Sequence, residues 1–518
     1  MAYWMGIDVG TGGTRALLLN LAGEVVASAA AVHPPIAMPR PLWAEQDARD
    51  WWSAAQAAIA AALKQAKIAG SDVEAIGLTG QMHGVVLLGA RGEVLGPSLI
   101  WCDQRTQPQV EELNRRLGRE QVHRHIANPL LTGFSAPKLL WERQHRPEEF
   151  RRAGKFLLPK DYLRFCLTGG YASDVSDASG TGLFDVLARR WSAAMLEALE
   201  LKPDFVPEVF ESIAVTGAIS AAAASATGLR AGTKVVAGGG DQAAGAVGNG
   251  IVAAGLASAT LGTSGVLFAA TDRPLADPRG RIHTFCHAVP GEWHVMGVTQ
   301  AAGLSLRWVR DQLGEAERQA EAAGGGDAYD TLCALAAGAP PGSEGLFFLP
   351  YLMGERAPHL DPEARGGWIG LTASHTRAHL VRAVLEGVAY SLRDSLEIFR
   401  ALGIPVREIR LSGGGARGEV WPRIQADVYN TPCVLLASQE GAAYGAALLA
   451  MVGSGAYGSL GEACGKCLRP ARRLEPGLEA AAAYDAGYAL YRDLYPRLQS
   501  WFPRLRAKLN SQSASDFA

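Results

Sequence analysis

The sequence predicts an α/β protein made of two similar domains, and three observations lead to this prediction. At 518 residues the chain exceeds the roughly 250 to 300 residues at which a single hydrophobic core stops growing. Short apolar runs that end at glycine alternate with longer stretches of helical spacing, as in an α/β sheet. A turn rich in glycine and threonine recurs in the second half of the chain, which indicates a distant internal duplication.

The first half begins with predicted strands that are separated by tight turns. The first apolar run stops at Gly10, and a second break follows at Gly23. An alanine-rich stretch then predicts a helix, and a buried type of strand comes after it. The expected strands cover residues 3–9, 14–21, 24–31 and 73–79, and the expected helix covers residues 47–66.

The same pattern restarts near the middle of the chain. A strand at residues 233–237 is broken by three glycines and followed by a short helix, after which two strands flank the second glycine and threonine turn. The later expected elements are strands at 256–261, 266–270 and 406–411 and helices at 377–402, 442–451 and 479–498. We expect one domain over residues 1–247, a second over 248–498, and a tail over 499–518 whose last eight residues, 511–518, are frayed.

The balance of charges excludes several classes of partner. Lys and Arg number 49 against 51 Asp and Glu, which gives a formal charge of -2 with both signs scattered along the chain. A nucleic-acid-binding or membrane-surface protein would show a basic patch or block. We therefore expect no nucleic acid and no membrane as partner, and the absence of a long apolar run predicts a cytoplasmic protein.

Two pairs of residues have the spacing of metal ligands or redox cysteines, and we interpret both pairs as structural. Cys464 and Cys467 form a C-x-x-C pair, but no second ligand pair or thioredoxin-like context accompanies them. His283 and His287 are four residues apart, yet residues 281–298 predict two strands joined at residues 290–291 instead of one helix. The odd count of seven cysteines in a chain of this size favours reduced thiols.

The first glycine and threonine turn has the chemistry of a phosphate cradle. A carboxylate at the end of a strand precedes glycines that allow backbone N–H groups to approach an anion closely. No G-x-x-x-x-G-K-[ST] motif is present, and the turn enters a strand instead of a helix, so it is neither a P-loop nor a dinucleotide fingerprint. An ordinary hairpin turn is the alternative. The residues concerned are Asp8, Gly10, Thr11, Gly12, Thr14 and Arg15.

A second such hairpin, at Gly262 and Thr263, makes ordinary turn chemistry a weaker explanation for both. We predict that the two hairpins contact the β- and γ-phosphates of one nucleotide. Asp241 and Gln242 follow three glycines at the start of the short helix, where helix capping is the structural alternative. Capping alone hardly requires three glycines before the acid.

A polar loop follows the strand at 73–79, at the carboxyl end where α/β proteins bind their ligands. It contains Gln81, Met82 and His83 between two glycines, and its donors and acceptors suit sugar hydroxyl groups. A histidine in such a loop can also serve a purely structural purpose. The glycines and the location favour a substrate loop.

These segments resemble the FGGY family of carbohydrate kinases over essentially the whole chain. Residues 80–84 resemble that family's xylulose-binding loop, and residues 101–105 resemble its W-x-D-x-R segment. Residues 133–141 resemble its first signature, with Lys138 and Trp141 in place, although Glu142 stands where the signature has an apolar residue. Further similar segments are residues 158–163, 176–181, 349–367 and 412–416.

The resemblance implies a two-domain, actin-like (ribonuclease H-like) ATPase fold with an active-site cleft between the domains. It implies ATP and Mg²⁺ as cofactors and D-xylulose or a related ketopentose as the phosphate acceptor, with Asp241 as the catalytic base. It also suggests a homodimer. The implied sugar contacts are Gln81, Met82, His83, Asp241 and Gln242; the implied nucleotide contacts beyond the two hairpins are Trp308, Gly414, Gly415 and Glu419; the implied metal contacts, through water, are Asp8 and Asp241.

Three other functions fit part of the sequence. Another kinase of the family could act on ribulose, glycerol or a related polyol, although the loop at Gln81 speaks against it. An actin-like ATP-binding regulator or chaperone would share the two hairpins but would need no sugar loop. A catalytically silent sugar-binding protein would not need Asp8, Thr11 and Asp241. For the base we expect an ordinary carboxylate pKa of about 4, which leaves it ionised at pH 7.

Overall fold

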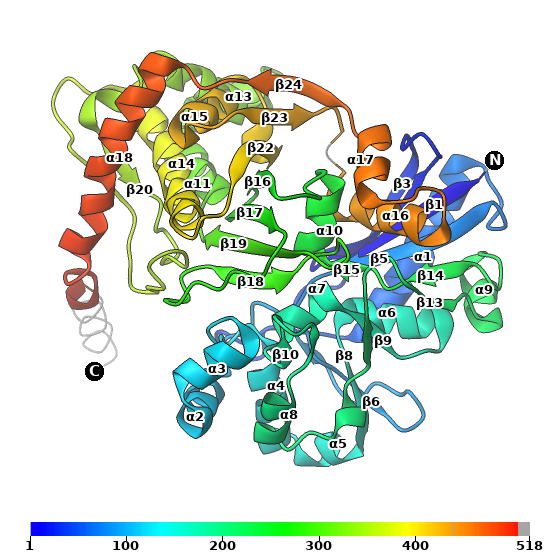
Figure 1. The fold of residues 1–518 in the computed structure, drawn as a ribbon. Helices are drawn as coiled ribbons and strands as arrows, with labels where there is room; N and C mark the ends of the chain where they lie inside the picture. Colours follow the sequence, from blue (N-terminus) through cyan, green and yellow to red (C-terminus); the bar gives the residue numbers. More distant parts are fainter. Residues whose placement is uncertain (1, 439, 506–518) are drawn as a thin grey trace. The chain divides into compact units, whose positions relative to one another are not determined.

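The computed structural model describes residues 2–438 and 440–505, and these residues form two compact units of α/β type (Figure 1). The segments of the first unit begin at Met1, Ala270 and Ser438, and those of the second begin at Ala254, Val295 and Pro470. Both units are therefore discontinuous in sequence. The α/β prediction is confirmed in each unit, whereas the expected division of the chain at residue 247 stays a prediction.

The main sheet of the first unit has the strand order β13-β14-β5-β1-β2-β3, and the short strand β15 also pairs with β5. β1 is antiparallel to β2 and parallel to β5, and both β14 and β15 are parallel to β5. The strands are β1 (Tyr3–Val9), β2 (Gly13–Leu19), β3 (Val25–Val32), β5 (Val73–Gly80), β13 (Val215–Ala218), β14 (Lys234–Val236) and β15 (Gly239–Gly240).

Two helices, α1 (Ala48–Ala66) and α16 (Gly441–Ser454), cover opposite faces of this sheet because successive side chains of a strand point to opposite sides. Met5, Ile7 and Val9 of β1 share a buried core with Trp51, Ala55 and other apolar residues of α1. Gly6, which lies between Met5 and Ile7 in β1, faces α16 so closely that a Cβ atom at this position would lie 1.8 Å from the carbonyl oxygen of Ala443. Glycine and alanine at these contacts allow α16 to lie directly on the strands.

Helix α10 (Asp241–Gly248) packs against α16 by the same small-residue principle, since a Cβ atom at Gly445 would meet the Ala244 carbonyl oxygen at 1.8 Å. The remaining helices of the unit are α2 (Gln107–Leu117), α3 (Arg119–Ile126), α4 (Ser135–His145), α5 (Pro147–Arg152), α6 (Pro159–Thr168), α7 (Val175–Ala178), α8 (Ala193–Ala198), α9 (Ala221–Thr227) and α17 (Leu460–Cys467). Its shorter strands are β4 (Glu45–Gln46), β6 (Val86–Gly89), β7 (Ser98–Leu99), β8 (Ala153–Leu157), β9 (Ala172–Asp174), β10 (Phe184–Asp185), β11 (Arg190–Trp191), β12 (Glu208–Phe210) and β18 (His283–Cys286).

The second unit is built on a sheet in the order β19-β17-β16-β22-β23-β24. Its strands are β16 (Gly255–Leu261), β17 (Gly265–Thr271), β19 (Trp293–Thr299), β20 (Phe347–Leu349), β21 (Gly367–Ile369), β22 (Val406–Gly413), β23 (Cys433–Leu436) and β24 (Pro470–Leu474). Its helices are α11 (Gly303–Leu313), α12 (Glu315–Ala322), α13 (Ala328–Ala336), α14 (Arg377–Ala401), α15 (Val420–Tyr429) and α18 (Leu478–Leu498).

The two sheets share one local topology, in agreement with the glycine and threonine turn that recurs in the sequence, whereas the internal duplication itself stays a prediction. In the first unit a hairpin joins antiparallel β1 and β2, and β1 is also parallel to β5 with Val9 opposite Gly80. In the second, a hairpin joins antiparallel β16 and β17, and β16 is parallel to β22 with Leu261 opposite Gly413. Each glycine and threonine turn thus lies beside the carboxyl end of a neighbouring parallel strand.

The predicted elements agree closely with the observed ones. The strand expected at 3–9 and the helix expected at 47–66 appear as β1 and α1, and Asp47 caps α1 by accepting a hydrogen bond from the Arg49 N–H. The long helix expected at 377–402 is α14. The frayed end expected at 511–518 lies outside the described residues.

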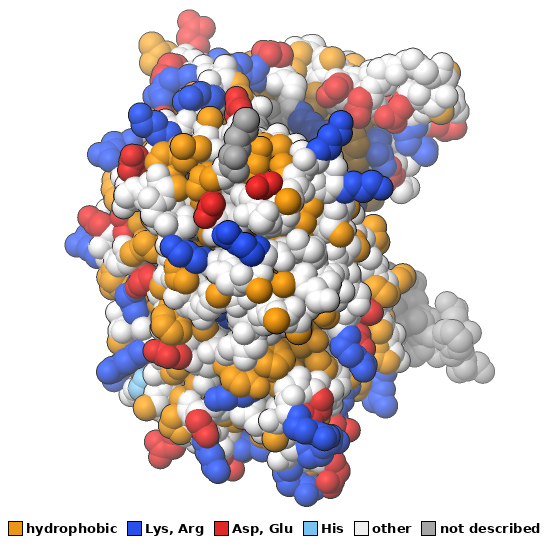
Figure 2. All heavy atoms as spheres, turned by 90° about the vertical axis from the view of Figure 1, so that its right-hand side faces the viewer, with side chains coloured by type: hydrophobic (Ala, Val, Ile, Leu, Met, Phe, Trp, Pro, Cys, Tyr) orange, Lys and Arg blue, Asp and Glu red, His pale blue; other side chains and the backbone are white. Residues whose placement is uncertain are grey.

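Surface charge follows the even composition. Figure 2 shows acidic and basic side chains interspersed over the face that it presents. Among residues 2–438 and 440–505, no helix combines the length and the apolar character that crossing a membrane requires.

Candidate active site

The carboxyl ends of three neighbouring parallel strands bring the predicted substrate and catalytic segments together in the first unit. In β1, Asp8 lies opposite Thr79 of β5, and in β15, Gly239 lies opposite the same Thr79. The loop that begins at Gln81 leaves β5 at this edge, and its first N–H donates to the Val9 carbonyl oxygen at 2.9 Å. Asp241 follows β15 directly, so the two predicted carboxylates lie on either side of the Gln81 loop.

Asp241 is the first residue of α10 and does not cap it. Gly240 occupies the N-cap position and offers no side chain to the helix. Burial, with a further contribution from the nearby Asp8 carboxylate, raises the pKa of Asp241 to about 7. The expectation of an ordinary carboxylate pKa is therefore wrong for this structure.

The glycines before Asp241 are required by close approach to β5. Gly238 has a φ of +76°, and a Cβ atom there would lie 2.0 Å from the carbonyl oxygen of Leu78. At Gly240 a Cβ atom would lie 3.0 Å from the Met82 side chain. Larger residues would displace the strand from the substrate loop.

Asp8 provides the second carboxylate at this edge. Burial raises its pKa to about 6, and the Arg15 guanidinium opposes this rise. Its Oδ1 atom is buried and has no hydrogen-bond partner in the protein. Within the described residues, no group of three His, Cys, Asp or Glu side chains could hold a metal. The unpartnered Asp8 Oδ1, with the Asp241 carboxylate near it, fits a cation that takes most of its ligands from water and phosphate, as Mg²⁺ does.

The first hairpin is built as predicted, but its side chains have different partners. The Gly10 N–H donates to the Gly13 carbonyl oxygen at 3.0 Å, and a Cβ atom at Gly12 would meet open space. Thr14 is fully buried, and its hydroxyl hydrogen-bonds His33 Nε2 at 2.9 Å. Arg15 pairs with Glu440. Because the Gly10 N–H is used within the turn, the backbone N–H groups of Thr11 and Gly12 are the donors that this hairpin could offer to an anion.

Gln81 is held by two residues instead of pointing freely into solvent. Its Nε2 donates to Gln46 Oε1 at 2.9 Å, and its Oε1 accepts from Thr11 Oγ1 at 3.3 Å. Gln46 also donates to the Thr11 carbonyl oxygen at 2.7 Å, and Trp101 Nε1 donates to the Thr11 hydroxyl at 2.9 Å. This network connects the predicted sugar loop to the predicted phosphate hairpin.

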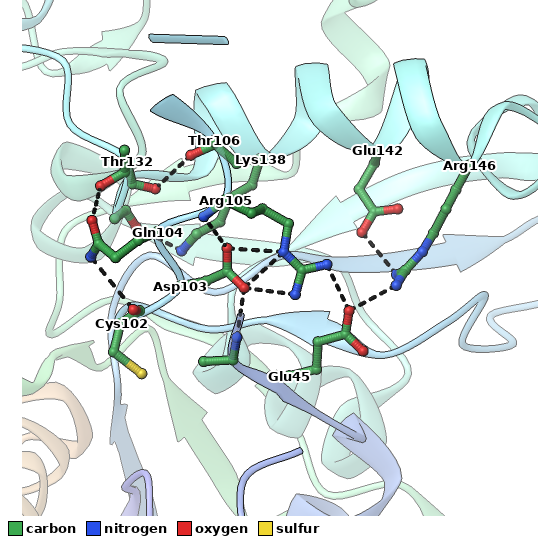
Figure 3. A network of polar contacts seen from close by, with 12 residues as sticks. Glu45, Cys102, Asp103, Gln104, Arg105, Thr106, Thr132, Lys138, Glu142 and Arg146 are labelled. Atoms are coloured by element: carbon green, nitrogen blue, oxygen red, sulfur yellow. Dashed lines mark hydrogen bonds and ion pairs between the residues drawn. The ribbon is translucent and has the colours of Figure 1, made fainter. Parts of the chain in front are cut away.

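Sequence reasoning missed Gln46, which no motif marks because it lies between Glu45 and the start of α1. Glu45 faces the other way, toward Arg105, whose Nη1 donates to Glu45 Oε1 at 2.8 Å. Arg105 Nε also donates to Asp103 Oδ2 at 2.8 Å, and this buried set is drawn in Figure 3. The W-x-D-x-R segment therefore anchors the short strand β4 that presents Gln46.

His83 adopts a strained backbone conformation with a φ of +68°. Its Nδ1 hydrogen-bonds the Gly180 carbonyl oxygen at 2.6 Å, and its ring stacks on Phe134 with centroids 5.0 Å apart. The buried Lys138 ammonium donates to the His83 carbonyl oxygen at 3.0 Å, and burial lowers the pKa of Lys138 to about 7. Lys138, which the family resemblance singled out, thus holds the backbone of the predicted sugar loop at His83.

In the second unit the hairpin at Gly262 and Thr263 is exposed and rests on the start of α11. The Gly303 N–H donates to the Gly262 carbonyl oxygen at 2.8 Å, and the Leu304 N–H donates to that of Thr263 at 3.1 Å. Arg307 Nη2 donates to the Thr263 hydroxyl at 3.3 Å. This arginine is a second residue that sequence reasoning missed.

The other predicted nucleotide residues lie on neighbouring elements of the same unit. Gly414 and Gly415 follow β22, and a Cβ atom at Gly415 would lie 2.6 Å from the Leu261 side chain. Trp308 lies on α11 with 37% of its surface exposed and its ring 5.9 Å from that of Trp368.

Glu419 differs from the predicted nucleotide contacts near it because it already has a partner within the protein. Its carboxylate forms an ion pair with Arg472 of β24. This ion pair does not decide whether Glu419 contacts the nucleotide, and that contact stays a prediction.

The two metal-like spacings have structural surroundings. The Cys464 thiol donates to the Val247 carbonyl oxygen at 3.5 Å, and Cys467 lies 3.8 Å from the Tyr457 hydroxyl. His283 hydrogen-bonds Asn128 Oδ1 at 3.1 Å on β18, and His287 accepts from the Val289 N–H after that strand has ended. The prediction of two strands with a turn between them is confirmed.

Comparisons with known proteins agree with this architecture. Residues 3–248 match the N-terminal domain and residues 257–454 the C-terminal domain of the FGGY family of carbohydrate kinases. The chain is 42% identical to the xylulose kinase of Escherichia coli (strain K12), over 96% of this chain and 99% of that protein. It is 36% identical to the xylulose kinase of Bacillus subtilis (strain 168), over 96% and 97%.

Solved structures of carbohydrate kinases also have this fold. The xylulose kinase of Rhodospirillum rubrum is 33% identical to this chain, with a TM-score of 0.89 and coverage of 96% of this chain and 99% of that one. The glycerol kinase of Plasmodium falciparum, at 21% identity and a TM-score of 0.84, shares the fold. The chain therefore belongs to the FGGY family of carbohydrate kinases and has the two-domain α/β fold of that family.

Proposed function

We propose that this chain transfers the γ-phosphoryl group of ATP to the 5-hydroxyl of D-xylulose, with Asp241 as the catalytic base. One observation carries the proposal: Asp241 and the Gln81–Met82–His83 loop lie at the same carboxyl edge of one sheet, on adjacent strands. A base beside a polar loop is the arrangement that phosphorylation of a sugar hydroxyl needs. The xylulose kinases that are 42% and 36% identical to this chain support D-xylulose as the acceptor.

In this proposal Asp241 accepts the proton of the sugar hydroxyl while the oxygen attacks the γ-phosphorus in line. Phosphoryl transfer has a loose transition state, so orientation of the hydroxyl contributes more than early proton removal. The raised pKa of Asp241 makes this carboxylate a stronger proton acceptor than an ordinary aspartate. Met82, His83 and Gln242 would contact the sugar around it.

The nucleotide would be held by backbone donors of the two hairpins. The N–H groups of Gly10 and Gly262 are already bonded within their turns, so these glycines would allow close approach while Thr11 and Gly12 of the first hairpin and Thr263 of the second would supply the donors. In the second unit Gly414 and Gly415 would face the ribose and Trp308 the adenine. Arg15 would have to leave Glu440 or act from that ion pair, because its guanidinium already lies against the Glu440 carboxylate.

Asp8 and Asp241 are the residues that would hold Mg²⁺ through its water ligands. The unpartnered Oδ1 of Asp8 supports this assignment. When bound, the metal supplies positive charge to the β- and γ-phosphate oxygens. The carboxylates contribute by orienting the metal's waters while Asp241 also faces the sugar.

The test is ADP release by the purified protein with Mg-ATP and a panel of acceptors. The panel contains D-xylulose, D-ribulose, L-ribulose, glycerol, gluconate and a blank without sugar. We expect the highest kcat/KM with D-xylulose and a product phosphorylated at C5, identified by NMR. Preference for another acceptor would replace the substrate assignment, and equal ADP release without sugar would contradict the kinase assignment.

A further inference from the structure

A buried hydrogen-bond chain reaches the backbone immediately before Asp241. Asp174 Oδ2 accepts a hydrogen bond from Ser176 Oγ at 2.5 Å, and Ser176 Oγ in turn accepts one from the Gly240 N–H at 3.1 Å. Asp174 and Ser176 are fully buried. The chain thus fixes the peptide group between Gly239 and Gly240, one residue before the proposed catalytic base.

The Asp174 end of this chain is firmly anchored. Its Oδ2 also accepts the Ser176 N–H at 2.8 Å, which caps α7, and its Oδ1 lies 3.0 Å from the fully buried Lys160 ammonium. Gly239 leaves room for the Ser176 hydroxyl at this place, since a Cβ atom there would lie 3.2 Å from it. The Ser176 oxygen is therefore held in one place opposite Gly240.

Gly240 depends on this contact more than another residue would. As the N-cap of α10 it has no side chain that could bond to the helix or to its surroundings. Rotation of the peptide group between Gly239 and Gly240 would turn Asp241 relative to the Gln81 loop. A single hydrogen bond from a rigid partner can prevent that rotation.

We propose that Ser176 is a positioning residue, which orients Asp241 through the Gly240 N–H. This inference rests on the proposed function, in which Asp241 is the base. Loss of the contact should lower the rate of phosphoryl transfer without weakening the binding of sugar or ATP, because misplacement by about 1 Å can reduce a rate by about 100-fold.

The chain offers a matched control. Ser212 Oγ donates to the same Asp174 Oδ2 at 3.0 Å and is equally buried, but its hydroxyl does not contact Gly240. Ser176→Ala and Ser212→Ala therefore each remove one hydrogen bond to Asp174. Only Ser176→Ala removes the acceptor of the Gly240 N–H.

The experiment measures kcat and both KM values with D-xylulose and Mg-ATP for wild type, Ser176→Ala and Ser212→Ala, together with their melting temperatures. We expect Ser176→Ala to lose about tenfold or more in kcat with KM values within about twofold, and Ser212→Ala to keep its kcat within about twofold. Ser176→Ala should also lose more thermal stability than Ser212→Ala, because it leaves the buried Gly240 N–H without its acceptor. If Ser176→Ala does not fold, Ser176→Cys replaces the hydroxyl with a slightly larger thiol that is a weaker acceptor, and it should show a smaller loss of kcat in the same direction.

Equal kcat values for the two alanine variants would overturn the inference, as would a loss confined to KM. Asp241→Asn, measured beside them, separates this outcome from failure of the proposed function. If Asp241→Asn is inactive while Ser176→Ala and Ser212→Ala have equal kcat values, only the positioning role of Ser176 is wrong. If Asp241→Asn keeps wild-type activity, the base assignment is wrong and the positioning role falls with it.

Discussion

Replacing Lys160 with methionine should destabilise the first unit strongly, because it leaves buried carboxylates without their cation. The Lys160 ammonium lies 2.6 Å from Asp161, 3.0 Å from Asp174 and 3.7 Å from Asp177. Lys160, Asp174 and Asp177 are fully buried, and Asp161 is 1% exposed. Removal of one partner from a buried ion pair costs about 3–5 kcal/mol. We expect a deficit of that size at pH 7.

The pH dependence of this deficit follows from proton uptake. Even in the wild type, burial raises the pKa of Asp177 well above its ordinary value despite the opposing Lys160 charge. Without the opposing Lys160 charge, the buried Asp177 carboxylate binds a proton still more readily in the folded than in the unfolded state. The folded state of the variant is therefore favoured as the pH falls, and the deficit should shrink between pH 7 and pH 5.

Urea unfolding followed by tryptophan fluorescence at pH 7 and pH 5 measures both effects. Lys64→Met, at an exposed position of α1, is the control and should change the unfolding free energy by less than about 0.5 kcal/mol. The double variant Lys160→Met/Asp161→Asn should regain part of the lost stability. A deficit below about 1 kcal/mol, or one that grows at lower pH, would refute the reasoning.

Three further changes test other parts of the structure. Gly238→Ala should lower the free energy of unfolding by at least about 2 kcal/mol more than Gly228→Ala does, as measured by thermal unfolding. Both positions have a φ near +75°, but only at Gly238 would a Cβ atom lie against a carbonyl oxygen. Equal losses of unfolding free energy would contradict this. Burial raises the pKa of Glu355 to about 7, so this group binds more proton in the folded than in the unfolded state between about pH 4.5 and 7, and its contribution to stability should fall as the pH rises over that range. Because burial also raises the pKa values of Asp8, Asp177 and Asp241, Glu355→Gln should reduce this dependence without abolishing it, as measured by melting temperatures at pH 5 and 7.5; an unchanged difference between the two pH values would contradict the role of Glu355. Trp308→Ala should raise the KM for ATP about fivefold or more without changing that for the sugar, since stacking of a base on an aromatic ring contributes about 1–3 kcal/mol; an unchanged KM for ATP would place the adenine elsewhere.

The elements around the site were predictable because their signals are local. An apolar run that ends at Gly10 defines β1, and the three glycines before Asp241 mark the break between β14 and α10. Composition and turn chemistry within about ten residues suffice for such elements. The repeated hairpin likewise predicted the shared topology of the two sheets.

Contacts between distant segments were not predictable in the same way. Gln46 contacts Gln81 across 35 positions, and Ser176 contacts Gly240 across 64, so neither pair leaves a pattern in a single sequence. The raised pKa of Asp241 depends on burial and on Asp8, which the fold brings near. The discontinuous units follow from strands and helices of one sequence half that pack in the other unit, as α16 does.

The role of Asp241 in phosphoryl transfer is tested by comparing ADP release by wild type and Asp241→Asn, each with Mg-ATP and with or without D-xylulose. Asparagine keeps the shape of the side chain but cannot accept the proton. The account predicts rapid release by the wild type only when the sugar is present, and a loss of about 100-fold or more in kcat for Asp241→Asn with retained sugar binding. Sugar-dependent turnover that survives in Asp241→Asn, or wild-type turnover that needs no sugar, would contradict it.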